Sequence, residues 1–252
     1  MSHDAPSLRP RCAAAIVFAV PLEADAFEAQ ATDSTSFESD GFVFREATVH
    51  GRRVAWCVAG VGGERAARAV QLLSIGHHPR LIVTAGFAGG LDPAVPRGSV
   101  VRPTEARDER RREPIPLLTD AGGPTLPILT VGRIIATARE KQALFNSSGA
   151  RVVDMETYSV AVAAREAGLR CACIRVVSDD AGHDLPREVA SLAGPQSGLR
   201  RLGAVVGAIG RRPSAVVDFW RLYEHAVVDG KTLATALLEF LGTLPVTDEP
   251  AP

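Results

Sequence analysis

Two carboxylates at the ends of expected secondary-structure elements are the side chains best suited to chemistry in this chain. Glu156 lies in the segment Val152–Tyr158, at the start of an expected helix. Asp179 follows the apolar run Ile174–Val177 and Ser178, just past the end of an expected strand. A strand that delivers a carboxylate into a loop presents an acid to a small ligand. One of these carboxylates could bind sugar hydroxyls while the other transfers a proton.

Two glycine-rich loops offer backbone groups to a ligand. Gly60–Gly63, which includes Gly62, lies between an expected strand and an expected helix, so its N–H groups suit an anion or a hydroxyl. The alternative is a tight connection without a ligand. The loop departs from the dinucleotide-binding fingerprint because Arg65 stands where the third glycine would fall. Gly86–Gly90 is similar, since small residues let the backbone approach a ligand closely.

Alternating strand and helix patterns must position these groups. A continuous apolar run predicts a strand covered on both faces at Ala13–Val20, and further buried strands are predicted at Leu81–Ala85 and Cys171–Val177. The dipeptide His50-Gly51 predicts a hairpin between two alternating segments, Phe42–Val49 and Arg53–Ala59. Helical spacing predicts helices at Glu64–Ile75, Thr137–Phe145, Met155–Ala167 and Ser214–Leu241. This alternation indicates a mostly parallel or mixed sheet with helices on both faces.

Length and composition predict one globular domain. The chain has 252 residues, of which 46% are hydrophobic, so it can bury a core of its own. We expect the domain to cover residues 12–242, including C-terminal helices from about 199 to 242, with a flexible leader at 1–11 and a flexible tail at 243–252. Residues 102–126 combine a mixed charge run with a stretch rich in proline and glycine. They predict a solvated loop, with a lid or a subunit contact as the alternative.

Charge and cysteine usage exclude several classes of protein. The net charge of −1 attracts neither nucleic acid nor an anionic membrane. The four cysteines lack C-x-x-C spacing, and His77-His78 precede Pro79 at an expected turn, so we expect no metal site and reduced, buried thiols. Arg9 and Arg11 before an apolar run resemble the start of a signal peptide, but its cleavage would delete a strand that the fold needs. We therefore expect a cytoplasmic protein.

Four blocks of residues resemble the nucleoside phosphorylase and nucleosidase superfamily, whose members include methylthioadenosine/S-adenosylhomocysteine nucleosidase. They occur in the expected order within residues 13–180, and they are Phe18–Asp25, Gly60–Gly63, Thr84–Leu91, and Val153–Glu156 together with Val177–Asp179. Within the superfamily the chain looks most like the hopanoid-associated phosphorylases, proposed to remove adenine from adenosylhopane. The segments that suggest this are Ala136–Leu144, Ser178–Ala181 with Leu185-Pro186, and Arg211–Pro213.

The resemblance implies a fold, an assembly and roles for single residues. The fold would be a three-layer α/β/α architecture with a central mixed sheet, assembled as a homo-oligomer. Glu156 would bind the ribose 2′ and 3′ hydroxyls, Met155 would pack against the sugar, and Asp179 would protonate N7 of the departing purine. These roles match the opposite charges that develop on sugar and base during glycosidic cleavage. The matching loops would supply further substrate contacts from Gly62, Phe87, Ala88, Gly89 and Ser178.

Departures from the family pattern leave two questions open. The carboxylate that helps to activate water in the nucleosidases aligns with Asp25, but Glu23 lies close by and either residue could serve. Phe87 replaces a serine that neighbours the nucleophile or phosphate in many relatives, and Thr84 stands where hexameric phosphorylases carry a phosphate-binding arginine. No cofactor is expected, and phosphate stays open as a co-substrate.

The expected function is cleavage of the N-glycosidic bond of a 5′-substituted adenosine by water or phosphate, with adenosylhopane as a candidate substrate. One alternative is a methylthioadenosine/S-adenosylhomocysteine nucleosidase, and another is a nucleoside-binding relative without activity. A third is a scaffold whose final helix contacts a partner or a membrane through Phe219, Trp220, Leu222 and Tyr223. Such side chains more often cover a sheet or a dimer seam.

Overall fold

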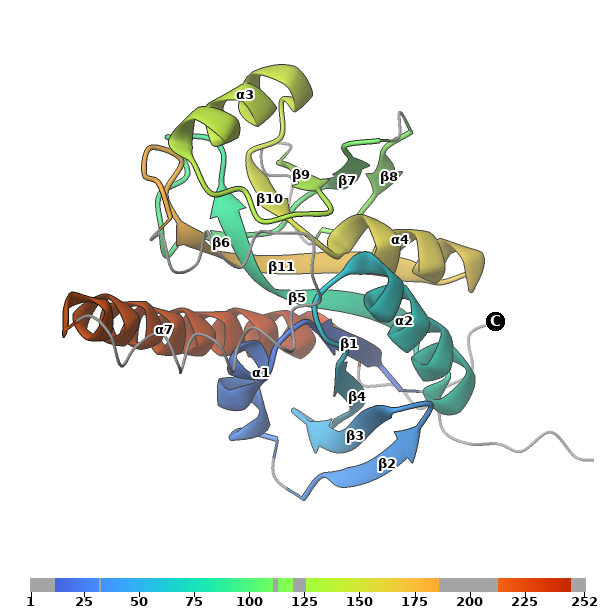
Figure 1. The fold of residues 1–252 in the computed structure, drawn as a ribbon. Coiled ribbons are helices and arrows are strands. Elements are labelled where there is room, and N and C mark those ends of the chain that lie inside the picture. Colours follow the sequence, from blue (N-terminus) through green and yellow to red (C-terminus); the bar gives the residue numbers. More distant parts are fainter. Residues whose placement is uncertain (1–11, 32, 111–112, 120–125, 186–212, 246–252) are drawn as a thin grey trace, which may run out of the picture.

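The computed structural model describes residues 12–31, 33–110, 113–119, 126–185 and 213–245 (Figure 1). The expected leader at 1–11, most of the expected tail (246–252) and the segment 199–212 of the expected C-terminal helices lie outside the described residues. So do the side chains of Phe219, Trp220, Leu222 and Tyr223, which were candidates for membrane contact. Within the described part of the chain, no helix is long and apolar enough to cross a membrane.

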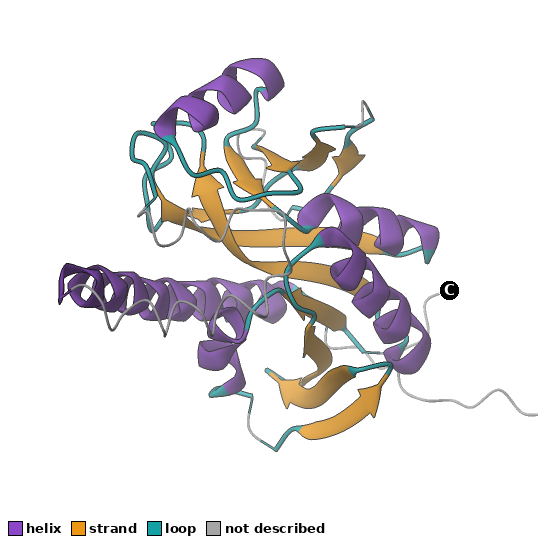
Figure 2. Ribbon diagram, in the orientation of Figure 1, coloured by secondary structure: helices purple, strands orange, loops and turns teal. Residues whose placement is uncertain are grey.

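Eleven strands form one mixed sheet, shown in orange in Figure 2. The main order is β2-β3-β4-β1-β5-β10-β9-β7-β8, and β11 pairs with both β5 and β6. The strands are β1 (Ala14–Phe18), β2 (Thr35–Ser39), β3 (Phe42–Val49), β4 (Arg52–Val58), β5 (Leu81–Gly90), β6 (Val100–Val101), β7 (Glu105–Asp108), β8 (Ile115–Pro116), β9 (Pro127–Thr130), β10 (Val152–Asp154) and β11 (Arg170–Asp179). Parallel pairs join β1 to β4 and β5, and β5 to β11, so the carboxyl ends of these strands share one edge.

Helices cover both faces of the sheet, which makes the fold a three-layer α/β/α architecture, as predicted (Figure 1). Successive side chains of a strand point to opposite faces. Accordingly Ala15 and Val17 of β1 join one core cluster, while Ala14, Ile16 and Phe18 join the other. The first cluster includes α2 (Gly63–His77) and α4 (Thr157–Glu166), and the second includes α1 (Pro21–Glu28) and α7 (Pro213–Thr243). The remaining helix, α3 (Ala138–Ser148), packs on a smaller cluster beside β9 and β10.

Local sequence signals explain several element boundaries. The predicted hairpin between β3 and β4 is confirmed, because His50 and Gly51 both adopt the positive φ angles, 48° and 73°, of a tight two-residue turn. Thr137 and Glu140 form a capping box at the start of α3, close to the predicted start of that helix. The final helix extends from Pro213 to Thr243, against a predicted Ser214–Leu241.

The prediction of a solvated loop at 102–126 is wrong for part of that segment. Its charged residues include β7, which pairs in parallel with β9, and β8 pairs with β7. Ala106 and Ile115 are buried in the core, while Glu105 and Arg107 on either side of Ala106 are half-buried. The alternation of charged and apolar residues therefore reflects a strand with one covered face. Residues 111–112 and 120–125 of this segment lie outside the described residues.

Candidate active site

The carboxyl ends of β5, β10 and β11 bring polar side chains together around the segment Gly86–Gly90. β10 ends at Asp154, which is 7% exposed and has its acceptors filled. The hydroxyl of Thr130 donates to Asp154 over 2.7 Å, the N–H of Thr157 donates over 3.0 Å, and Nη2 of Arg175 lies 2.7 Å away. Asp154 therefore connects β10, β9, α4 and β11, and its position fixes that of the residues that follow it.

Glu156 is the residue immediately before α4, and its carboxylate faces the loop before α2. One carboxylate oxygen accepts the Gly62 N–H over 2.8 Å. Gly62 has a φ of 108°, which a residue with a side chain would adopt only with strain. Burial and the neighbouring Asp154 carboxylate raise the pKa of Glu156 to about 7, although the Arg175 charge and the Gly62 N–H oppose this. Glu156 thus offers a buried carboxyl group able to bind hydroxyls near neutral pH.

Arg175 is a buried cation at the centre of this cluster. It is 2% exposed, and its Nη2 donates to Thr84 and Thr157 over 2.8 Å as well as to Asp154. A methyl group added to Gly86 would overlap both Nη1 of Arg175 and Oε1 of Glu23, so these two groups meet over Gly86. Burial opposes the charge of Arg175, but nearby carboxylates outweigh it and raise the pKa of the guanidinium.

Glu23 joins this cluster, whereas Asp25 does not. The Glu23 carboxylate is 5% exposed and accepts the N–H groups of Ala19, Val20 and Phe87 over 2.8, 3.0 and 2.7 Å. Burial raises the pKa of Glu23, while Arg175 and these N–H groups lower it by less. Asp25 is exposed on α1, because residues two apart in a helix point in different directions. Of the two alternatives for the second carboxylate, the structure places only Glu23 with Arg175 and Glu156.

Asp179 lies at the other end of the Gly86–Gly90 segment and has a different partner. Its Oδ2 is 2.6 Å from Nζ of Lys141, which is on α3 and is fully buried. Nζ also donates to the carbonyl oxygens of Asp180 over 2.6 Å and His183 over 3.0 Å. Ser178 donates to Asp179 over 2.9 Å. The Asp179 carboxylate, 23% exposed, is thus held by the Lys141 ammonium group, whose three hydrogens all have acceptors.

Three of the remaining candidate residues lie within Gly86–Gly90, and Met155 lies next to Glu156 in the chain. Gly89 lies beside Asp179, because a methyl group added to it would be 3.3 Å from Oδ2. The buried Ala88 offers its carbonyl oxygen to the Ser178 hydroxyl over 3.3 Å, and Phe87 uses its N–H on Glu23. Met155 is half-buried between Asp154 and Glu156 in the chain. Apart from Asp25, the candidates named from the sequence therefore come from one region.

Comparisons with known proteins identify the family of this chain. The sequence model of the phosphorylase superfamily matches residues 13–125 and 124–200. The chain belongs to the phosphorylase superfamily. A comparison with curated proteins found no match.

Solved structures from this superfamily share the fold. The S-adenosylhomocysteine nucleosidase of Streptococcus pyogenes, in complex with 5-methylthiotubericidin, is 17% identical with a TM-score of 0.72, covering 93% of this chain and 98% of its own. The Colwellia psychrerythraea methylthioadenosine/S-adenosylhomocysteine nucleosidase, in complex with adenine, is 18% identical with a TM-score of 0.71 over 93% and 96%. The futalosine hydrolase of Helicobacter pylori is 15% identical with a TM-score of 0.66 over 90% and 97%.

Sequence reasoning missed the two buried cations of this candidate site. Arg175 interrupts the apolar run of β11, and Lys141 lies one turn before the buried Leu144 on α3. Arginine and lysine are almost never fully buried unless they are paired. For Arg175 a charge within an apolar pattern was therefore the available signal, and it would have indicated nearby carboxylates. Lys141 lies among polar residues, so its sequence surroundings gave no such signal.

Proposed function

We propose that this protein cleaves the N-glycosidic bond of a purine nucleoside. The observation that carries the proposal is the placement of two charged groups at opposite ends of Gly86–Gly90. Glu23, Glu156 and Arg175 lie at one end, and Asp179 with Lys141 lies at the other. Glycosidic cleavage develops positive charge on the sugar and negative charge on the base. Two separate groups can stabilise these two charges at once.

The end that contains Glu156 suits the sugar. Its carboxyl group would bind the ribose 2′ and 3′ hydroxyls, with Met155 against the ring. Glu23 would act as the general base toward the group that attacks the sugar, because its carboxyl group is held beside Arg175 over Gly86 and burial raises its pKa. Arg175 would hold the Glu23 and Glu156 carboxyl groups in place. Membership of the phosphorylase superfamily supports this assignment.

The end that contains Asp179 suits the departing base. Asp179 would donate a proton to N7 of the purine, with Ser178 orienting the carboxyl group through its 2.9 Å hydrogen bond. Lys141 lies 2.6 Å behind the same carboxyl group, so a proton held by this pair is available next to the leaving group. Gly89 and Ala88 leave room for the base because neither carries a long side chain.

Water is the acceptor that this site favours over phosphate. Arg175 is surrounded by the carboxyl groups of Glu23, Asp154 and Glu156, so little positive charge remains for a phosphate dianion. The Thr84 hydroxyl already accepts a hydrogen bond from Arg175, and the Phe87 N–H already donates to Glu23, so neither group is available to phosphate. We therefore propose hydrolysis, with no cofactor, as the reaction.

For the substrate we propose a 5′-substituted adenosine. Support comes from the similar structures, since a mutant of the methylthioadenosine/S-adenosylhomocysteine nucleosidase of Helicobacter pylori, 15% identical with a TM-score of 0.67, was solved with 5′-methylthioadenosine in its active site. The Streptococcus pyogenes nucleosidase was solved with a methylthio analogue. The sequence resemblance to hopanoid-associated phosphorylases adds adenosylhopane to the candidates. A homo-oligomer is proposed on the resemblance to the superfamily, and a cytoplasmic location on the reading of the N-terminal segment as a strand of the fold.

The test is adenine release from methylthioadenosine, S-adenosylhomocysteine and adenosine, each with and without phosphate. Asp179→Asn serves as the blank, and we expect its rate to fall about 10²- to 10⁴-fold, as for loss of a general acid. Release that needs no phosphate and is lost in Asp179→Asn would support hydrolysis. Release only with phosphate would overturn the choice of water. A folded protein that neither binds nor cleaves any of the three would exclude these substrates and leave adenosylhopane, or a nucleoside-binding protein without activity, as the alternatives to test.

A further inference from the structure

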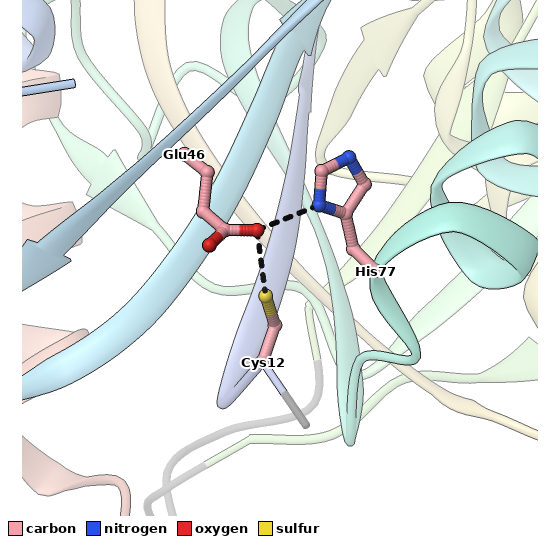
Figure 3. A group of neighbouring side chains, drawn as sticks. All are labelled: Cys12, Glu46 and His77. Carbon is pink, nitrogen blue, oxygen red and sulfur yellow. Dashed lines mark hydrogen bonds and ion pairs between the residues drawn. The ribbon is translucent and has the colours of Figure 1, made fainter. Parts of the chain in front are cut away.

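Three potential metal ligands from separate parts of the chain meet at the base of β1 (Figure 3). Cys12 lies just before β1, Glu46 is in β3 and His77 is the last residue of α2. Cys12 Sγ is 3.8 Å from Glu46 Oε2, and His77 Nδ1 is 2.9 Å from the same oxygen. All three donor atoms lie within 4.8 Å of one another. Ligand atoms around one tetrahedral ion are separated by similar distances, roughly 3.3–3.8 Å for bonds of about 2.0–2.3 Å.

The backbone holds these residues in register. The Cys12 N–H donates to the His77 carbonyl over 3.3 Å, and the Arg80 N–H donates to the Cys12 carbonyl over 3.0 Å. The end of α2 and the start of β1 are therefore joined directly beside the cluster. The backbone therefore fixes the relative positions of Cys12 and His77. This lowers the free-energy cost of bringing the sulfur and imidazole ligands together around a metal ion.

Arg53 orients the third ligand. Its Nε donates to Glu46 Oε1 over 2.8 Å, which leaves Oε2 directed at Cys12 and His77. Carboxylate ligands of metal ions are commonly held by such a hydrogen bond to their second oxygen. The Arg53 charge also offsets one of the two negative charges that a thiolate and a carboxylate would bring to the site.

The surroundings are largely apolar but open on one side. Cys12 is fully buried, while the side chains of His77 and Glu46 are 10% and 18% exposed. The rings of Phe37 and Phe44 lie 6.1 and 6.2 Å from the His77 ring. An ion at this position would thus have an apolar shell that excludes bulk solvent, and one direction from which a water molecule can reach it.

We propose that Cys12, Glu46 and His77 bind a zinc ion as thiolate, carboxylate and imidazole ligands, with water in the fourth position. Zinc fits because a sulfur ligand disfavours magnesium and calcium, which prefer oxygen, while mixed sulfur, nitrogen and oxygen sets are typical of zinc. The competing interpretation is a hydrogen-bonded cluster in which the Glu46 carboxylate accepts from the thiol and the imidazole and no ion binds.

The ion would link three elements of the fold at a distance from the proposed active site, with water completing its coordination. Cys12 and Ala19 flank β1 at its opposite ends. The Ala19 N–H donates to the Glu23 carboxylate, so the Ala19 end is the end at the proposed active site. At about 3.3 Å per residue these ends are roughly 20 Å apart. Zinc would fasten β1, β3 and α2 together at the edge of the sheet that lies away from the proposed active site. The proposal therefore does not rest on the proposed function.

The experiment uses untagged protein that has been treated with a chelator and then titrated with Co²⁺ in the absence of oxygen. Thiolate ligation gives a sulfur-to-cobalt charge-transfer absorption, which neither a carboxylate nor an imidazole produces. We expect this absorption to saturate at one Co²⁺ per chain, to disappear on addition of Zn²⁺, and to be absent from Cys12→Ser. Cys57→Ser is the matched control, because Cys57 is also fully buried but belongs to no such cluster among the described residues.

Two further measurements keep the test decisive if Cys12→Ser folds poorly. His77→Gln should weaken Co²⁺ binding while the thiol is intact, and Arg53→Gln should weaken it by about 10- to 100-fold, as for loss of a partner that orients a ligand. Zn²⁺ should also raise the Tm of the wild type and of Cys57→Ser. A wild type without the charge-transfer absorption, or an absorption that survives Cys12→Ser, would overturn the proposal in favour of the hydrogen-bonded cluster.

Discussion

The two ends of Gly86–Gly90 hold their charges in different ways. At the Gly86 end, one guanidinium, that of Arg175, faces the carboxyl groups of Glu23, Asp154 and Glu156. At the Gly89 end, the single carboxylate of Asp179 faces the single ammonium of Lys141. The first cluster has more carboxyl groups than cations, and the second is balanced.

This difference in charge balance bears on what each end can do. Burial and the neighbouring Asp154 carboxylate raise the pKa of Glu156 to about 7, so the crowded end keeps a group that exchanges protons near neutral pH. In the balanced pair, one ammonium and one carboxylate instead share a proton in a fixed geometry, which suits a residue that must pass that proton to one atom of the leaving group. The contrast predicts that the crowded end depends on its cation more strongly than the balanced end does.

Removing each cation is the most direct way to break the comparison. Arg175→Met would leave several buried carboxyl groups without a counter-charge and should lower the free energy of unfolding by about 5 kcal/mol, the upper range for a broken buried pair. Lys141→Met should cost about 3 kcal/mol, because water reaches the partly exposed Asp179. Urea unfolding followed by circular dichroism measures both. Equal losses in the free energy of unfolding would contradict the comparison, because they would show that the surplus of carboxyl groups does not make the Gly86 end depend more strongly on its cation.

Within the crowded end, Glu23 and Asp25 on the same helix provide a matched pair. Glu23→Gln should reduce kcat/KM for nucleoside cleavage by about 10³-fold, in the range for loss of a general base. Asp25→Asn makes the same chemical change on the exposed side of α1 and should keep nearly wild-type activity. Steady-state rates of adenine release decide the matter. A loss in Asp25→Asn as large as that in Glu23→Gln would contradict the placement of the general base.

Glu156 should make stability depend on pH. A carboxyl group whose pKa rises from 4.5 to about 7 on folding binds its proton more tightly in the folded state. Its contribution to the free energy of unfolding is therefore highest below pH 4.5 and falls by about 3 kcal/mol as the pH rises to about 7.

Glu156→Gln cannot ionise, so it should lose less stability than the wild type between pH 5 and pH 8. Urea unfolding at the two pH values gives the difference, and Asp25→Asn should keep the wild-type slope. A Glu156→Gln protein with the same pH dependence as the wild type would show that the folded state does not raise this pKa.

Much of the fold could be predicted from the sequence because its signals are local. The hairpin at His50-Gly51 needs only two residues with positive φ, and the buried strands need only continuous apolar runs. The strand β7 was missed for a physical reason. Its charged residues Glu105 and Arg107 alternate with the buried Ala106, and a strand of four residues is too short for that alternation to stand out from a charge run.

The candidate site was predicted only in part, because contacts between distant segments are not written in local patterns. Glu156 and Asp179 stood out through their position at element ends. The choice between Glu23 and Asp25 depends on which face of α1 is turned toward the sheet. The meeting of Cys12 with Glu46 and His77 likewise depends on strand register and on the end of α2, and no spacing in the sequence predicts it.

Two glycines of β5 offer the finest test of the difference between the two ends. Neither Gly86 nor Gly89 has a positive φ, so an added methyl group acts only through space. At Gly86 it would overlap the Glu23 carboxylate and the Arg175 guanidinium, whereas at Gly89 it would lie 3.2 Å from Val153 Cγ1 and 3.3 Å from Asp179 Oδ2. At the Gly86 end, Glu23 and Arg175 cannot move away from the added methyl group without breaking their hydrogen bonds.

Gly86→Ala should therefore cost about 2 kcal/mol in the free energy of unfolding, as for overpacking, together with most of the activity. Gly89→Ala should cost less than half of that in stability, and its effect should fall mainly on KM, since its methyl group would enter the space proposed for the base. Urea unfolding and steady-state kinetics on both variants separate these outcomes. If Gly89→Ala were the more destabilising of the two, the Asp179 end would be the more tightly packed one. This outcome would contradict the comparison between the two ends.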